Sequence, residues 1–267
     1  LTNEDIIITV KDMTKPVIKL ENTYQKFEAG SMYVPLTAIV EDNCDTNIKV
    51  TYDQVNMRKV GIQTIYYRAV DAAGNVATPV KVTVEIVDTT APTIEFDHNN
   101  MSSNLVKIDD THYEQTYTRN SKYTTPKFIL KDNADGEIDI NKSGLLDSST
   151  PGIYTITYTA IDAQGNQSNN RVTVTVKVLD YAPTITFKSA ENGRKYLLES
   201  RTYNKEMLLY FTGEGTLRNL TTGDTHSIKS GETWISNGQY EFIVRLNPGT
   251  ELEVEKIIKF TIDTANS

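Results

Sequence analysis

Cysteine is nearly absent from this sequence, because Cys44 is the only one among 267 residues. A single cysteine excludes an internal disulfide and any zinc site built from cysteine ligands. Small exported domains often carry disulfides, so the scarcity of cysteine leaves the cellular compartment undecided on physical grounds. Histidine is also rare, and the three histidines stand in no recognisable catalytic or metal-binding pattern.

Long apolar runs and basic clusters are missing too. No stretch of about 18 apolar residues occurs, so we expect no segment that spans a bilayer and no membrane contact by this chain. Lys and Arg (27) are outnumbered by Asp and Glu (35), which gives a formal net charge of −8. Nucleic-acid binding needs clustered basic residues, so this balance argues against it, whereas an acidic surface is compatible with cation binding.

Catalytic groups in a recognisable arrangement are absent as well. A serine or cysteine nucleophile needs a nearby base and a group that orients it, and no such pattern surrounds the histidines. Cys44 stands in an Asn-Cys-Asp turn, where a catalytic thiol is not expected. We therefore predict that the chain is not an enzyme and carries no organic cofactor.

What the sequence does contain is an internal repeat. A proline followed by an alternating apolar segment occurs at Pro16, Pro92 and Pro183. An alternating segment that ends in aspartate precedes each of these prolines, at residues 6–12, 82–88 and 172–180. Because proline cannot extend a strand ladder, each repeat is expected to end in a long strand, turn at the proline and begin again.

A second pair of matching segments follows the same repeat. Residues 61–75 read GIQTIYYRAVDAAGN, and residues 152–166 read GIYTITYTAIDAQGN. Apolar and polar side chains alternate in both, which is the period of a strand with one buried face. The glycine and asparagine at each end are typical of tight hairpins. Since no segment has a helical period longer than a turn or two, the sequence predicts an all-β fold.

The repeat predicts three tandem immunoglobulin-like β-sandwiches. Their expected bounds are 13–88, 89–180 and 181–267, and residues 1–12 are assigned to the end of a preceding domain or to a linker. Tyr67, Tyr158 and Val244 should be buried at equivalent positions of one strand. The chain begins inside a strand-like segment, so we expect it to be part of a larger polypeptide.

These motifs resemble the bacterial Ig-like repeats related to the hyalin repeat and to the Ig modules of pesticidal crystal proteins. Such repeats combine a D-T-x-x-P linker, an acidic D-x-x-D-G turn and the pattern G-x-Y-x-x-x-Y-x-A-x-D-x-x-G-N. The second repeat matches at 88–92, 132–136 and 152–166, whereas the first departs at Thr46 and Gln63. The third lacks the acidic turn and the closing motif. The resemblance implies an Ig-like fold and an extracellular or bacterial cell-surface location, and it leaves the function open.

Acidic side chains recur at three places that an Ig-like sandwich brings together. The incoming linker, the loop between the second and third strands, and the turn between the last two strands meet at one end. Ca²⁺ takes about six to eight oxygen ligands, several of them carboxylates, so this end is a candidate calcium site. The candidate ligands are Asp88, Asp132, Asp135, Asp162 and Asn166 in the second repeat, with Asp12, Asp42, Asp45 and Asp71 in the first.

Turn chemistry is the alternative interpretation of these acids, and on the sequence alone it is the more common one. Aspartate and asparagine cap their own backbone in turns, with no ion present. The third repeat lacks the equivalent acids, so a calcium site is expected at the first two repeats only.

Two aromatic features are candidates for ligand binding. A polar insertion at about 97–127 contains Tyr113, Tyr117 and Tyr123, although an extra edge hairpin whose tyrosines cover the sandwich is the favoured interpretation. Trp234 is the only tryptophan, and such a residue lies in or over a core more often than it forms a sugar platform.

The sequence therefore predicts a non-catalytic Ig-like segment of a bacterial cell-surface or secreted protein that acts as a stalk or adhesion module. Its expected partners are a host or matrix protein or a glycan, and not nucleic acid. If the segment is a stalk, its sandwiches should lie end to end. The alternative is an accessory carbohydrate- or protein-binding module of an exported glycoside hydrolase or peptidase, which needs an exposed aromatic platform such as Trp234.

Overall fold

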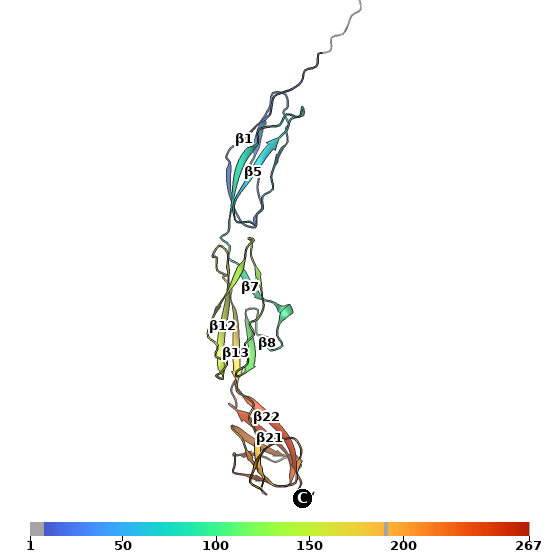
Figure 1. The fold of residues 1–267 in the computed structure, drawn as a ribbon, viewed down its shortest axis with the longest axis vertical. Coiled ribbons are helices and arrows are strands. Elements are labelled where there is room, and N and C mark those ends of the chain that lie inside the picture. Colours follow the sequence, from blue (N-terminus) through green and yellow to red (C-terminus); the bar gives the residue numbers. More distant parts are fainter. Residues whose placement is uncertain (1–7, 190–191, 267) are drawn as a thin grey trace, which may run out of the picture. The chain divides into compact units, whose positions relative to one another are not determined.

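The computed structural model describes residues 8–189 and 192–266, and it is all-β (Figure 1). Apart from the short 3-10 helices η1 (His98–Asn100) and η2 (Thr264–Asn266), every regular element in these ranges is a strand. The all-β, Ig-like sandwich fold predicted from the repeat is confirmed. Residues 8–16 contain no strand, and the rest of the strand predicted at 6–12 lies outside the described residues.

The first repeat contains two sheets that enclose one core. β1 (Val17–Leu20) pairs with β3 (Ala38–Glu41), and the other sheet has the order β2-β6-β5-β4. Its strands are β2 (Tyr24–Glu28), β4 (Val50–Tyr52), β5 (Gly61–Ala69) and β6 (Val80–Val87). Alternate side chains of β6, such as Val82 and Val84, are fully buried and share a cluster with Ile18 of β1. Period-2 alternation in the sequence thus becomes a one-sided apolar face.

The second repeat has a two-stranded sheet, β10-β7, and a five-stranded sheet, β11-β12-β13-β9-β8. The strands are β7 (Thr93–Phe96), β8 (Leu105–Lys107), β9 (His112–Thr118), β10 (Phe128–Lys131), β11 (Ile138–Ser143), β12 (Gly152–Asp162) and β13 (Val172–Leu179). β9 runs parallel to β13, as β2 runs parallel to β6 in the first repeat. The segment predicted as an insertion at 97–127 therefore contains a regular strand of the repeat, and the additional elements are η1 and β8.

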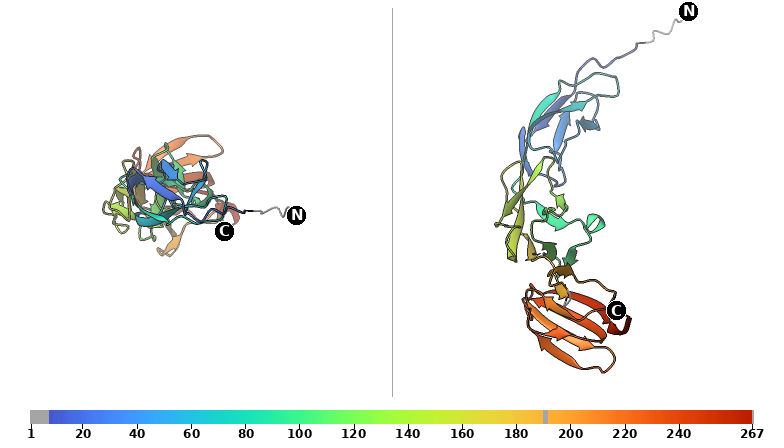
Figure 2. Two further views of the ribbon diagram at one scale, coloured as in Figure 1. Left: turned by 90° about the horizontal axis from the view of Figure 1, so that it is seen from above. Right: turned by 60° about the horizontal axis from the view of Figure 1, so that its bottom comes forward.

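The third repeat has the sheets β15-β14-β17-β20 and β16-β22-β21-β18-β19. Figure 2 shows its larger sheet broadside, in orange and red. The strands are β14 (Thr186–Ser189), β15 (Lys195–Leu197), β16 (Thr202–Tyr203), β17 (Met207–Tyr210), β18 (Glu214–Asn219), β19 (Thr225–Ile228), β20 (Trp234–Ile235), β21 (Gly238–Leu246) and β22 (Val254–Ile262). Phe187 of β14 and Phe242 of β21 belong to one buried cluster, so side chains of both sheets share the core.

The long strands β5, β12 and β21 bury equivalent side chains. Tyr67, Tyr158 and Val244 are at most 1% exposed, as the repeat alignment predicts. The Tyr67 hydroxyl accepts a hydrogen bond from Leu36 N at 2.8 Å, and the Tyr158 hydroxyl lies 2.9 Å from the hydroxyl of Tyr123. Each buried phenol therefore has a polar partner, which removes the cost of burying it unpaired.

The chain divides into two compact units. The first comprises the described residues up to Ile94, with Leu130–Asn141 and Thr159–Asn170, and the second comprises Glu95–Ile129, Lys142–Tyr158 and the described residues from Arg171. This border passes through the second repeat, so it does not decide the division into three domains, which stays a prediction. Within the described ranges, no helix has the length and hydropathy of a membrane span.

Candidate metal centres

Three aspartates from separate segments converge at the start of the second repeat, within the first compact unit. Asp88 follows β6 in the linker, Asp132 follows β10, and Asp162 is the last residue of β12. Each contributes a carboxylate oxygen to a group whose atoms all lie within 4.8 Å of one another. We call these residues the second trio. They are one residue from each of the three acidic places that the sequence indicates.

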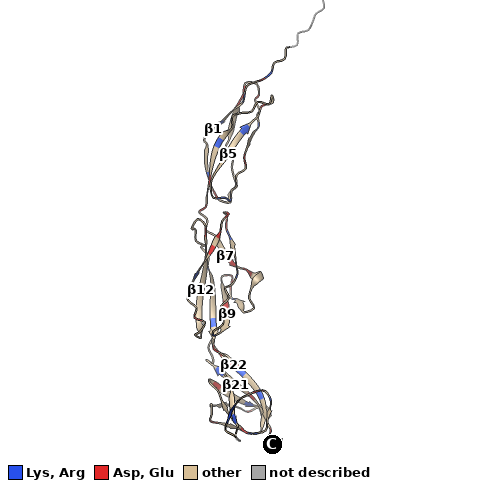
Figure 3. Ribbon diagram, viewed as in Figure 1, with Lys and Arg blue, Asp and Glu red and all other residues tan. Residues whose placement is uncertain are grey.

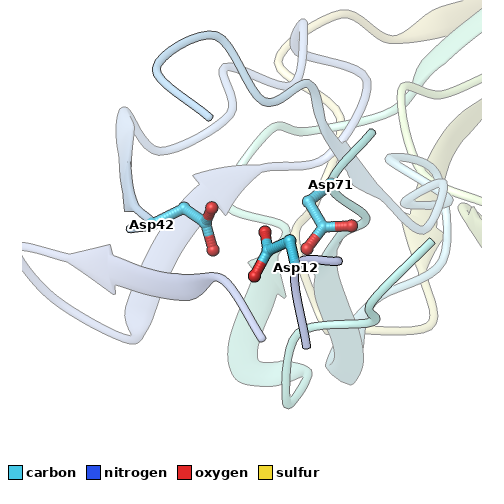
Figure 4. Close-up of side chains that lie close together, drawn as sticks. All are labelled: Asp12, Asp42 and Asp71. Carbon is cyan, nitrogen blue, oxygen red and sulfur yellow. The ribbon is translucent and has the colours of Figure 1, made fainter. Parts of the chain in front are cut away.

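The first trio is the same arrangement one repeat earlier, and it consists of Asp12, Asp42 and Asp71. Their carboxylate oxygens also lie within 4.8 Å of one another. Figure 4 shows the three side chains turned toward the same space, from the linker, the loop after β3 and the turn after β5. The first trio also belongs to the first compact unit.

One aspartate of each trio is fully occupied by its own turn. Asp162 accepts hydrogen bonds from the backbone amides of Gln164 and Asn166 at 2.9 and 2.8 Å, and from Asn166 Nδ2 at 2.8 Å. In the first trio, Asp71 accepts from the amide and the Nδ2 of Asn75, both at 2.7 Å. The Asp-x-x-Gly-Asn motif is therefore a hairpin turn, closed by Gly74 at φ +89° and Gly165 at φ +89°.

The other four aspartates use only one carboxylate oxygen in this way. Asp12, Asp42, Asp88 and Asp132 each accept a hydrogen bond from a backbone amide two residues later. The second oxygen of each is buried and has no hydrogen-bond donor among the described residues. A buried acceptor without a donor costs roughly 1–3 kcal/mol, and more when it is charged. Turn chemistry thus accounts for one oxygen of each side chain and leaves the other without a partner.

The carboxyl groups of the second trio have opposite pKa shifts. Burial raises the pKa of Asp88, which is 7% exposed, and the charges of Asp132, Asp162 and Glu28 raise it further. Burial also acts to raise the pKa of Asp162, but the hydrogen bonds from Asn166 outweigh this effect and the pKa is lowered. Within the trio, ionisation is therefore favoured at Asp162 and less favourable than usual at Asp88.

The remaining predicted ligands lie beside the trios and hold the loops that carry them. Asp45 accepts a hydrogen bond from Ala72 N at 2.7 Å, and Asp135 forms an ion pair with Arg58 at 2.8 Å. Asn166 donates its Nδ2 to the carbonyl oxygen of Asp88 at 3.2 Å. The structure thus brings together three side chains at each place, where the sequence indicated four or five.

The donor set of the trios fits a hard divalent cation. Ca²⁺–oxygen distances are about 2.3–2.6 Å, so ligands on opposite sides of the ion are about 5 Å apart at most. The separations of up to 4.8 Å within each trio are compatible with that sphere. All six side chains offer only oxygen, which favours Ca²⁺ or Mg²⁺ over zinc or copper. Asp12, Asp42 and Asp71 would hold one ion, and Asp88, Asp132 and Asp162 the other.

The linker into the third repeat carries Asp180, which contacts an arginine instead of other aspartates. Asp180 accepts a hydrogen bond from Tyr181 N at 2.8 Å and another from Arg119 Nη1 at 3.2 Å. Both bonds lower the pKa of Asp180. The described residues contain no third group of acids within metal-binding distance. Sequence reasoning missed Arg119, because no local pattern connects it with an aspartate 61 positions later.

The candidate aromatic residues of the second repeat contact other residues of the same repeat. Tyr113 is fully buried and lies 3.2 Å, through its hydroxyl, from His98 Nδ1. The Tyr117 hydroxyl accepts from Thr124 N at 3.1 Å, and the Tyr123 hydroxyl contacts Tyr158. β8 and β9 form an antiparallel hairpin with β8 at the edge of the sheet. The three tyrosine hydroxyls thus have partners within the second repeat, and a role of these residues in ligand binding stays a prediction.

Trp234 lies outside the core, in contrast to the more common position that the sequence suggests. Its side chain is 48% exposed on β20, and it lines a cavity of about 340 Å³. Leu217, Ile228 and Tyr240 are apolar neighbours in this cavity, which also has the polar side chains of Asn219, Asp224 and His226.

Figure 3 shows that basic and acidic positions are interspersed along the described chain.

Comparison with known proteins confirms the resemblance stated from the motifs. Residues 110–178 match the family model described as "Bacterial surface protein, Ig-like domain". Internalin I of Listeria monocytogenes serovar 1/2a (strain ATCC BAA-679 / EGD-e) is 25% identical over 186 residues, which are 68% of this chain and 10% of internalin I. An uncharacterized 81.3 kDa protein of Acholeplasma phage L2 is 25% identical over 243 residues, which are 83% of this chain and 30% of that protein.

Solved structures that match this chain include cadherin fragments. Drosophila N-cadherin EC1-4 is 14% identical, covers 93% of this chain and 75% of its own, and has a TM-score of 0.27. Human CDH23 EC21-23 is 15% identical, covers 93% of this chain and 100% of its own, and has a TM-score of 0.31. At these TM-scores the likeness adds nothing to the strand topology. Residues 110–178 thus resemble an Ig-like domain of bacterial surface proteins, within a chain whose described part is all-β.

Proposed function

We propose that this chain is a non-catalytic Ig-like segment of a bacterial cell-surface or secreted protein, and that it acts as a stalk whose first two repeats bind Ca²⁺. The observation that carries the proposal is the pair of aspartate trios, in which four buried carboxylate oxygens have no donor. The repeat and the match of residues 110–178 to a surface-protein family support the location.

The partner that these oxygens lack is a cation rather than another hydrogen-bond donor. Each trio combines three carboxylates within 4.8 Å, so their negative charges repel one another at neutral pH. A protein donor could satisfy one oxygen, but a divalent cation satisfies several at once and neutralises their charge. The same arrangement occurs in two repeats, with the same residue type at the linker, the loop and the turn.

A cation at a trio would fasten the incoming linker to the sandwich that follows it. In the second trio, Asp88 belongs to the linker, while Asp132 and Asp162 belong to the loop and turn of the next repeat. Short linkers that contain proline already restrict the rotation of one domain against another. Calcium would restrict it further, which is the property that a stalk requires to present a distal domain.

Isothermal titration calorimetry of the full chain tests this proposal. After chelation, calcium should titrate about two sites, with affinities in the range of roughly 0.1–1 mM that extracellular modules use. Asp132→Asn should remove one site and Asp42→Asn the other, because each variant loses one carboxylate of one trio. Asp139→Asn is the matched control, since Asp139 is an exposed acid on β11 outside both trios. Absence of binding up to 10 mM calcium would contradict the proposal.

A second candidate function rests on the half-exposed Trp234. An aromatic face beside a cavity with amide, carboxylate and imidazole groups is compatible with a sugar ring, which stacks its apolar side and hydrogen-bonds at its rim. This supports the alternative of an accessory carbohydrate-binding module. A glycan array with the full chain tests it, and a signal that Trp234→Ala removes while Tyr196→Ala retains would favour it. Tyr196 is a 40% exposed aromatic residue outside this cavity.

A further inference from the structure

The loop at residues 132–136 has two roles within the first compact unit. Asp132 belongs to the second trio. The following residues contact the end of the first repeat: Asp135 N donates to the carbonyl oxygen of Arg58 at 2.6 Å, and Asn133 Nδ2 donates to the carbonyl oxygen of Ala29 at 2.8 Å. The same five-residue loop therefore carries a candidate metal ligand and a hydrogen-bonded interface.

The interface has an apolar centre. Ala134 is only 6% exposed and belongs to the core cluster of the first repeat, together with Ala29 and Ile86. Gly30 has φ +70°, and a Cβ atom there would lie 3.0 Å from both the Cβ and the carbonyl oxygen of Asn133. A side chain at position 30 would thus strain the backbone and crowd Asn133.

Arg58 and Glu28 hold the two segments that supply the ligands Asp88 and Asp132. Arg58 Nη2 donates to the carbonyl oxygens of Asp132 and Ala134, both at 3.2 Å. Glu28 accepts hydrogen bonds from Thr89 N at 2.7 Å and from Thr90 Oγ1 at 2.9 Å. Residues next to both ligands are therefore attached to the end of the first repeat.

Without a cation, the neighbouring charges of Asp88 and Asp132 repel each other, which opposes the approach of the linker to the loop. With a cation, both segments are drawn to one centre, in the arrangement in which their neighbours meet Glu28, Ala29 and Arg58. We infer that calcium at the second trio closes this contact, so that the 132–136 loop is a calcium-dependent clasp on the first repeat. This inference rests on the proposed calcium binding and adds its structural consequence.

The second compact unit provides an internal control. There Arg119 neutralises the linker residue Asp180, and Lys177 pairs with both Glu114 and Glu251 at 2.9 Å. A protein cation replaces the metal in these contacts, so they should not respond to calcium. The amide of Arg119, which donates to the carbonyl oxygen of Leu179 at 2.7 Å, reports on them.

Hydrogen exchange of single amides in the full chain tests the clasp. The Asp135 amide should exchange at least roughly tenfold more slowly in 10 mM calcium than in chelator, because closing the clasp protects its bond to Arg58. The Arg119 amide should not change. Asp132→Asn should remove the calcium effect at Asp135, whereas Asp139→Asn should retain it.

Linkage provides a second readout, since an interface that calcium tightens must in turn strengthen calcium binding by the same factor. Gly30→Ala should weaken one of the two calorimetric binding steps several-fold and leave the other unchanged. Gly223→Ala is the matched control, because Gly223 has φ +83° but a Cβ atom there would meet no other atom within 4 Å. Gly223→Ala therefore introduces the same kind of backbone strain without the close contact, and both binding steps should persist.

Failure of the clasp and failure of calcium binding give different results in these experiments. If calorimetry detects calcium but the Asp135 amide exchanges equally in calcium and chelator, the clasp is refuted and the calcium site stands. If Gly30→Ala leaves both affinities unchanged, the coupling is refuted in the same way. If no calcium binds at all, the proposed function itself fails.

Discussion

Replacing Asp88 by asparagine should have opposite effects on stability in chelator and in calcium. In chelator the variant should be more stable than the wild type at pH 7. Asp88 is 7% exposed, one of its oxygens lacks a donor, and burial raises the pKa of its carboxyl group. Asparagine removes the charge, and its amide can donate toward Asp132, whose Oδ1 also lacks a donor. Relief of one unsatisfied buried acceptor is worth about 1 kcal/mol.

In calcium the order should reverse. A site with a dissociation constant of about 1 mM stabilises the folded state by about 1.4 kcal/mol at 10 mM calcium, from the mass-action relation. The wild type gains this amount at the second trio, whereas the Asp88→Asn variant loses the site. The two melting curves should therefore exchange places between chelator and calcium.

Differential scanning calorimetry of the full chain measures both effects. A change of 1 kcal/mol moves the melting temperature by roughly 2–8 °C for domains of this size range. Asp139→Asn removes one exposed carboxylate and should follow the wild type in both buffers. An Asp88→Asn variant that is less stable than the wild type in chelator and in calcium alike would contradict a calcium ligand at this position and leave Asp88 as a turn former.

Other contacts lead to three further predictions. Tyr67→Phe leaves Leu36 N without its acceptor inside the first repeat, so the free energy of unfolding from urea titration should fall by about 1–2 kcal/mol, with the exposed Tyr66→Phe as a neutral control. The folded chain without calcium holds a proton on Asp88 more readily than the unfolded chain, because the Asp88 pKa is raised. This contribution to stability falls as pH rises above about 3.9, and protons compete with calcium, so the calcium-induced shift in melting temperature should shrink as pH is lowered. Small-angle scattering in calcium should give an extended particle, and a compact globule would contradict a stalk.

The sequence predicts most of the strands and the trios because the relevant signals are local. Alternation in 152–166 indicates a one-sided strand, and Tyr158 is buried at the expected phase. The acids come together because Ig-like topology places the linker, one loop and one turn at the same end, and this holds for Asp88, Asp132 and Asp162. Position along a repeat is sufficient to derive this grouping.

What sequence reasoning cannot reach are contacts chosen by side chains far apart in the chain. Asp132 and Asp135 both match the acidic-turn motif. Only Asp132 joins a trio, whereas Asp135 pairs with Arg58, 77 positions earlier. The segment around β9 is polar and reads as an insertion, because its pairing parallel to β13 depends on a partner strand that follows 54 or more residues later. Ala134 has no apolar pattern around it, and only the end of the first repeat makes it a core residue.

Calcium binding by the two trios can be observed directly in a crystal structure of the full chain, from crystals grown in millimolar calcium. We expect one ion at each trio, with oxygens of Asp88, Asp132 and Asp162 at about 2.3–2.6 Å from the second ion. We also expect Asp88 Oδ2 and Asp132 Oδ1, which have no donor among the described residues, to be ligands. Crystals in millimolar calcium with no ion at either trio, and with those two oxygens bound only to water or to protein donors, would contradict it.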